Sequence, residues 1–303
     1  MVNSIFKRQN DKYLLKCLVA QRKEYSAAKC ASAWKSYLTV VFAAISVVAS
    51  LLDIDMLSAI SSLLAIALLV TTRHIDTYTE KHRKHAASIQ QYVDVMLYSF
   101  VLGSEAAEWG NLPSGTDFAE SISVIEDTSL EPVKNWYSDY SSLEPVQQVF
   151  YCQKENLRWD FKLRVEFKRI MLCAFAAVLV VLTIASFTVN PSLIKFICTL
   201  SWLLPIADFC FSYYSNLQND IQRLNKMKEK SDSIEQMLSE GDPDKYRPAL
   251  ISLQQQILDS RENAVLVPDW FYRLRQSKHQ NDEDKIADVI QNDVVKQNCN
   301  TSV

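Results

Sequence analysis

Two pairs of nearly charge-free stretches dominate the pattern of apolar and polar positions along the chain. The first pair covers residues 36–52 and 56–72, and the second covers residues 170–189 and 196–214. A helix needs roughly 17–25 apolar residues to cross the hydrocarbon core of a bilayer, so each stretch has the length of a transmembrane helix. Only a few polar residues separate the members of each pair. The pattern therefore predicts two antiparallel transmembrane hairpins.

Lysine and arginine residues near the ends of these stretches predict how the hairpins are oriented. Positive charges concentrate beside the four ends that lead to the N-terminus, the central segment and the C-terminus, whereas the hairpin tips carry only Asp53, Asp55 and Lys195. Cytoplasmic loops of membrane proteins are enriched in Lys and Arg. We therefore expect a multi-pass protein whose N- and C-termini are both cytoplasmic.

The segments outside the hairpins are expected to be mostly helices that run directly into the predicted spans. Only four glycines occur in the chain, and none lies in a span, which favours long unbroken helices. The fold class is an all-α integral membrane protein. Its parts are a cytoplasmic entry helix (1–35), the first hairpin (36–72), cytoplasmic helices with an irregular excursion at 103–131 (73–169), the second hairpin (170–214), cytoplasmic helices with a docking turn (215–275) and a polar tail (276–303).

Two of these parts carry specific expectations. The docking turn, Val267–Tyr272, is densely apolar and should bury its side chains against another element. The tail is polar throughout, and we expect it to be loose or to form a short helix.

The two halves of the chain resemble each other at a fixed offset. Residues 20–24 resemble residues 152–156, and Ile89-Gln90 matches Ile221-Gln222 at the same offset of 132 residues. The match predicts an internal duplication in which each unit is a pair of long antiparallel helices. Both units enter the membrane from the same side, which is a parallel repeat.

Composition and motifs exclude several functions. The net charge of −3 and the absence of a basic domain argue against binding of DNA or RNA polymers. None of the common catalytic motifs is present, so we expect no enzymatic activity. His74, His82 and His85 have the residue type for part of a metal site. The alternative, which we favour, is a basic interfacial face beside lipid headgroups, with no metal and no other cofactor.

Asp208 is the ionisable residue that stands out in the fourth predicted span, three residues after Pro205. Ionisable groups within a bilayer are costly and usually face a bundle interior or water. We interpret Asp208 and Pro205 as part of a pore lining or gate. The alternative is a salt bridge or interface contact with Lys168 or Arg169.

Arginine and aromatic residues recur on the cytoplasmic segments. Guanidinium groups bind phosphate and aromatic faces stack on bases, so this combination suits a nucleotide. The alternative is that these arginines pair with buried carboxylates such as Glu24, Glu155, Asp160 and Glu262. The candidate ligand-binding residues are Arg22, Tyr25, Asn156, Arg158, Trp159, Arg261, Trp270, Tyr272 and Arg273.

An ordered set of short motifs resembles a known family. They are Gln9-Asn10, Ala20–Lys29, Ile89–Asp94, Trp136-Tyr137, Gln153–Asp160, Arg261 and Val267–Tyr272. Together with the two hairpins they are similar to the SMODS-associated four-transmembrane effector family of bacterial anti-phage, CBASS-like systems. The resemblance implies an effector that forms pores in, or disrupts, the bacterial inner membrane when a cyclic oligonucleotide second messenger binds its cytoplasmic helices.

Small residues along the first hairpin favour close contact between helices, which suits a homo-oligomer. The expected partners are therefore the lipid bilayer, a cyclic nucleotide and further copies of the chain. Two alternatives stay open: a non-conducting membrane scaffold that recruits a cytosolic partner, and a small transporter that uses Asp208.

Overall fold

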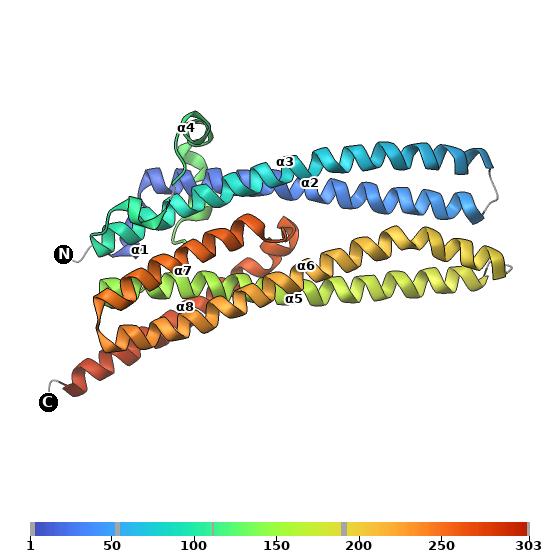
Figure 1. Cartoon of the computed structure of the whole chain (residues 1–303). Coiled ribbons are helices and arrows are strands. Elements are labelled where there is room, and N and C mark those ends of the chain that lie inside the picture. The colour runs from blue at the N-terminus through green and yellow to red at the C-terminus, as the bar shows by residue number, and fades with distance from the viewer. Residues whose placement is uncertain (1–3, 52–54, 111, 189–192, 302–303) are drawn as a thin grey trace.

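Two long helical hairpins form the frame of the molecule (Figure 1). The computed structural model describes residues 4–51, 55–110, 112–188 and 193–301. The first hairpin pairs α2 (Lys12–Leu51) with α3 (Asp55–Leu102), and the second pairs α5 (Pro145–Thr188) with α6 (Leu193–Glu240). The hairpins lie side by side with both tips at the same end of the molecule. Each helix runs without interruption from a predicted span into a segment predicted to be cytoplasmic, as the scarcity of glycine predicts.

Shorter elements surround the opposite end of the hairpins, where both chain termini lie. Throughout the described residues the chain is helical or irregular, with no strand, so the all-α prediction is confirmed. These elements are α1 (Ile5–Arg8), the 3₁₀ helices Ala106–Trp109, Asp127–Ser129 and Glu131–Val133, α4 (Thr116–Ser123), α7 (Pro243–Asn263) and α8 (Asp269–Thr301). The excursion at 103–131 holds only short elements, as its glycine, proline and serine content predicts.

The two hairpins agree in length with the predicted duplication. Helices α2 and α3 have 40 and 48 residues, and α5 and α6 have 44 and 48. Their side chains have diverged. Gln21 donates to Gln90 inside the first hairpin, whereas Gln153, at the matching position, donates to Gln254 of α7. The duplication itself stays a prediction.

A small apolar cluster fixes the docking turn against the second hairpin. Val267 and Phe271 pack with Leu163 and Phe167 of α5 and with Leu217 of α6. The burial predicted for the turn is confirmed for Val267 and Phe271. It is wrong for Trp270, which is 59% exposed, because the turn begins α8 and successive helical side chains point in different directions.

The polar tail is helical, which agrees with one of the two alternatives, but it continues the 33-residue α8 and is not a short helix of its own. Three residues at intervals of four, His279, Glu283 and Ala287, are buried. Residues four apart share one helix face, so this stripe packs onto the body of the protein. Glu283 accepts from Arg158 Nε at 2.8 Å and from Lys162 Nζ at 3.0 Å, both on α5. Low hydropathy did not predict this burial, because the buried carboxylate of the stripe pairs with cations on another helix.

Within the described residues, none of the helices combines the length and the hydropathy that a membrane span requires. The hairpin tips at 52–54 and 189–192, which include Asp53, Asn190 and Pro191, lie outside the described residues.

Replacing Glu283 by Gln should lower the free energy of unfolding by about 3 kcal/mol, because Arg158 and Lys162 lose a fully buried counter-charge. Thermal unfolding in detergent, together with limited proteolysis of α8, measures this. Asp288→Ala, an exposed position on the same helix, is the matched control. Equal stability of the two variants would contradict the docking role assigned to Glu283.

Candidate functional site

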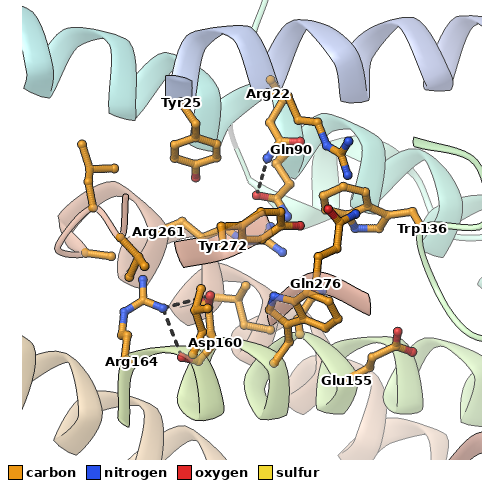
Figure 2. A pocket seen from close by; sticks show the side chains of 18 of the residues that line it. Arg22, Tyr25, Gln90, Trp136, Glu155, Asp160, Arg164, Arg261, Tyr272 and Gln276 are labelled. Carbon is orange, nitrogen blue, oxygen red and sulfur yellow. Dashed lines mark hydrogen bonds and ion pairs between the residues drawn. The ribbon is translucent and has the colours of Figure 1, made fainter. Parts of the chain in front are cut away.

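A cavity of about 530 Å³ lies between the bases of the two hairpins. Its walls come from α2, α3, α5 and α6, from residues 132–137, and from the end of α7 and the start of α8. Figure 2 shows side chains from these elements pointing toward one another across the cavity. Its volume falls in the range of about 300–1,000 Å³ typical of small-molecule sites.

The lining of the cavity is cationic and aromatic. Six Lys or Arg side chains and three carboxylates line it, so its net charge favours an anion. Five aromatic side chains offer ring faces: Tyr25, Trp136, Tyr137, Trp159 and Tyr272. This combination of positive charge and ring faces suits a ligand with phosphates and bases.

Four of the six cations already have carboxylate partners. Arg164 pairs with Asp160 at 2.9 Å and with Asp220 at 3.3 Å. The others are Lys29, Lys134 and Arg261, paired with Asp269, Glu131 and Asp94. Across the described residues, Arg22 and Arg273 form no ion pair, which leaves these two guanidinium groups as the cations most available to a ligand.

Arg22 projects from α2 beside two aromatic residues of the cavity wall (Figure 2). Its guanidinium carbon lies 5.5 Å from the centroid of the Trp136 ring, a cation–π distance. Its Nε atom is buried and has no hydrogen-bond partner among the described residues. Tyr272 lies next to it; burial raises the pKa of the Tyr272 hydroxyl, and Arg22 partly offsets that rise. A buried, unpaired donor of this kind is suited to a phosphate oxygen.

Arg261 holds the cavity floor together and has less freedom to bind a ligand. Its Nη1 atom donates to Asp94 of α3 at 2.7 Å, and both side chains are almost fully buried. Asp94 also accepts from Gln254 of α7 and from the Tyr137 hydroxyl. One nitrogen of Arg261, Nη2, has no hydrogen-bond partner among the described residues. Arg261 therefore fits the alternative interpretation, in which the arginine pairs with a buried carboxylate, better than it fits a ligand-binding role.

The structure brings seven of the nine candidate ligand-binding residues together at this cavity. They are Arg22, Tyr25, Asn156, Trp159, Arg261, Tyr272 and Arg273. It does not bring Arg158 there, because Arg158 pairs with Glu283 at 2.7 Å. Trp270 also lies outside, on the exposed face of α8. Ligand binding by the seven stays a prediction.

Sequence reasoning missed Trp136 and Lys29 as candidates. Trp136 appeared only as part of a motif, because it lies in an irregular segment where no periodicity assigns a direction to a side chain. Lys29 likewise appeared only within the motif Ala20–Lys29. Both line the cavity. The only available signal for Lys29 was its spacing of seven residues from Arg22, which places both on one helix face.

The remaining candidates lie elsewhere. Asp208 is exposed on α6, and the side chain of Pro205 lies outside the described residues. Lys168, a proposed partner of Asp208, donates to Gln218 at 2.7 Å. His82 pairs with Glu24, and His85 bonds to Ser121. In the part of the chain that the structure describes, no group of three or more His, Cys, Asp or Glu residues is placed to hold a metal ion.

Glu155 is a buried carboxyl group in the cavity wall. It is 4% exposed, and its two oxygens accept from the Ser138 backbone N at 3.2 and 3.3 Å. Burial raises the pKa of Glu155 to about 8, and Glu283 adds to the rise. The folded chain therefore binds a proton here that the unfolded chain releases near pH 4.5.

Comparison with known proteins places the chain among bacterial effectors. Residues 3–290 match the family model described as the SMODS-associating 4TM effector domain. A protein of Bacillus cereus (strain VD146) described as a probable CBASS effector molecule is 27% identical over 215 residues, which cover 70% of this chain and 68% of that protein. No solved structure matches.

The proton on Glu155 predicts a pH dependence of stability. Because its pKa is raised in the folded state, its contribution is fully present below about pH 4.5 and is lost as the pH rises through 8. Glu155→Gln stays neutral and should gain a few kcal/mol relative to wild type between pH 5 and 8.5. Thermal unfolding across this range measures the difference, with the exposed Glu144→Gln as control. Parallel pH profiles for wild type and Glu155→Gln would refute the prediction.

Proposed function

We propose that the chain, which belongs to the SMODS-associating 4TM effector family, is a CBASS effector in bacterial antiviral defence. In this proposal a cyclic oligonucleotide binds the cavity between the hairpins, and the protein then forms pores in, or disrupts, the bacterial inner membrane. The similarity to the probable CBASS effector of Bacillus cereus supports the setting.

The observation that carries the proposal is the position of the cavity. It is lined by ring faces and by arginines, two of which form no ion pair among the described residues, and its walls include α2, α3, α5 and α6, which continue into the predicted spans. A ligand changes the balance between two states only if it binds them with different affinity. A ligand that contacts both hairpins at once meets this condition when the hairpins move relative to each other.

Membrane action is supported by the surface of the distal halves of the hairpins. Large apolar side chains are exposed there: Leu63, Ile66, Leu69, Val181, Ile184 and Phe211 are each between 59% and 71% accessible. Exposed apolar surface of this kind marks contact with lipid or with another protein. The family description, which specifies four transmembrane segments, favours lipid.

Calorimetry in detergent with a panel of cyclic di- and trinucleotides tests the site. Losing a charge-assisted phosphate contact costs about 1.5–3 kcal/mol, so Arg22→Ala and Arg273→Ala should each weaken binding roughly tenfold to a hundredfold. Arg247→Ala, outside the cavity, is the control and should bind as wild type does. If folded wild type binds no member of the panel, the proposed function is overturned. If binding survives both cavity substitutions, the binding site lies elsewhere.

Labelling of single introduced cysteines in intact cells tests the membrane topology. A membrane-impermeant maleimide should react with a cysteine at Asp55, the first residue of α3, above the wild-type background. It should not react with a cysteine at Ser114 or Ser277 until the membrane is permeabilised, because the flanking positive charges predict a cytoplasmic location. Reaction at Ser114 in intact cells would contradict the arrangement.

A further inference from the structure

The connection between α7 and α8 forms one wall of the cavity. This segment, residues 264–269, is called the strap below. Five of its six residues line the cavity: Ala264, Val265, Leu266, Val267 and Asp269. It also reaches both hairpins, so its position depends on where each hairpin lies.

On the second hairpin the strap is held by buried contacts. The backbone N of Val265 donates to Asp220 Oδ2 at 2.7 Å, and Asp220 is 2% exposed. The Tyr213 hydroxyl donates to the carbonyl oxygen of Leu266 at 2.9 Å. Val267 is buried in the apolar cluster described above. These buried contacts attach the strap firmly to the second hairpin.

On the first hairpin the strap is held mainly by one carboxylate. Asp269 accepts from Ser26 Oγ at 2.7 Å and from Lys29 Nζ at 2.8 Å. The Asp269 side chain is 28% exposed and that of Lys29 is 18% exposed. One further bond, from Arg83 Nη1 to the Ala264 carbonyl oxygen at 3.2 Å, is longer. Partly hydrated ion pairs are weaker than buried contacts, so the strap is more easily released from the first hairpin than from the second.

The same face of α2 carries Arg22, which forms no ion pair among the described residues and whose Nε atom has no hydrogen-bond partner there. Arg22, Ser26 and Lys29 follow at intervals of four and three residues and therefore share one face of the helix. All three line the cavity. A ligand with one phosphate bonded to Arg22 that extends along this face brings a second phosphate to the Lys29 ammonium that Asp269 now holds. Phosphate and carboxylate then compete for one cation.

We infer that Asp269 is an autoinhibitory latch that a ligand phosphate displaces from Lys29, which frees the first hairpin from the strap. The inference rests on the proposed function, because it requires an anionic ligand in this cavity. The chain's own carboxylate lowers the affinity for that ligand, since binding must first break the contacts of Asp269 with Ser26 and Lys29.

The substitution Asp269→Asn tests the latch, because asparagine removes the charge but still supports the start of a helix. Hydrogen exchange of the amides of residues 264–272, measured without nucleotide, should be faster than in wild type. Calorimetry with cyclic di-AMP, cyclic di-GMP and cyclic GMP–AMP should show about three- to tenfold tighter binding of whichever nucleotide binds wild type. Asp127→Asn, which removes ion pairs to Lys12 and Lys16 of α2 outside the cavity, should change neither quantity.

A second variant separates loss of the latch from loss of the site. Lys29→Gln also frees the strap, so exchange should again be faster, but it removes a ligand contact and the affinity should fall. Unchanged exchange in Asp269→Asn overturns the latch even if a nucleotide binds, as does equal or weaker affinity in that variant. Failure of every nucleotide to bind folded wild type overturns the proposed function, while the exchange experiment tests separately whether Asp269 holds the strap to the first hairpin.

Discussion

The buried ion pair between Asp94 and Arg261 is the contact on which the arrangement of the half of the molecule away from the hairpin tips depends. Asp94 lies on α3 of the first hairpin, and Arg261 lies on α7, which packs its apolar face on α5 and α6. Asp94 also accepts from Tyr137 and Gln254, so one carboxylate joins three elements. Removing either charge would leave the other buried without a partner, a loss of about 3–5 kcal/mol. This pair joins the first hairpin to α7 beside the cavity, whose lining includes Arg261.

Further polar contacts join the hairpins at this level. Gln254 donates to Gln91 of α3 and accepts from Gln153 of α5, and Asn156 donates to Tyr137. Apolar burial is non-directional, whereas a hydrogen bond requires a particular distance and angle. A junction built this way specifies one relative position of the hairpins. It also responds to a ligand that carries charge, because such a ligand competes for the same donors and acceptors.

The sequence predicted the parts of this structure that depend on local pattern. Long apolar stretches with little glycine predicted the continuous helices of both hairpins. The pairing of Asp94 with Arg261 could not be predicted, because 167 residues separate them and the local pattern around Arg261 is that of any surface helix. The burial of the stripe on α8 could not be predicted for the same reason, because its hydropathy is low and its charged partners lie on α5. Composition identified the residue types of the cavity, but only the fold decided that Arg158 faces Glu283.

Stiffness of the helices links the cavity to the hairpin tips. No glycine or proline interrupts α2 after Arg22, and its remaining 29 residues extend about 44 Å at 1.5 Å per residue. Interior proline or glycine is the usual cause of a kink or weak point in a helix, so a rotation of α2 at the cavity is carried along its length. Of the four long helices, α6 alone contains an interior proline, Pro205. The first hairpin therefore has the more rigid sequence, and the same hairpin is attached to the strap mainly through the partly hydrated contacts of Asp269. A small change of charge at the base of a rigid pair of helices becomes a larger displacement at its tip, because the displacement grows with distance from the point of rotation.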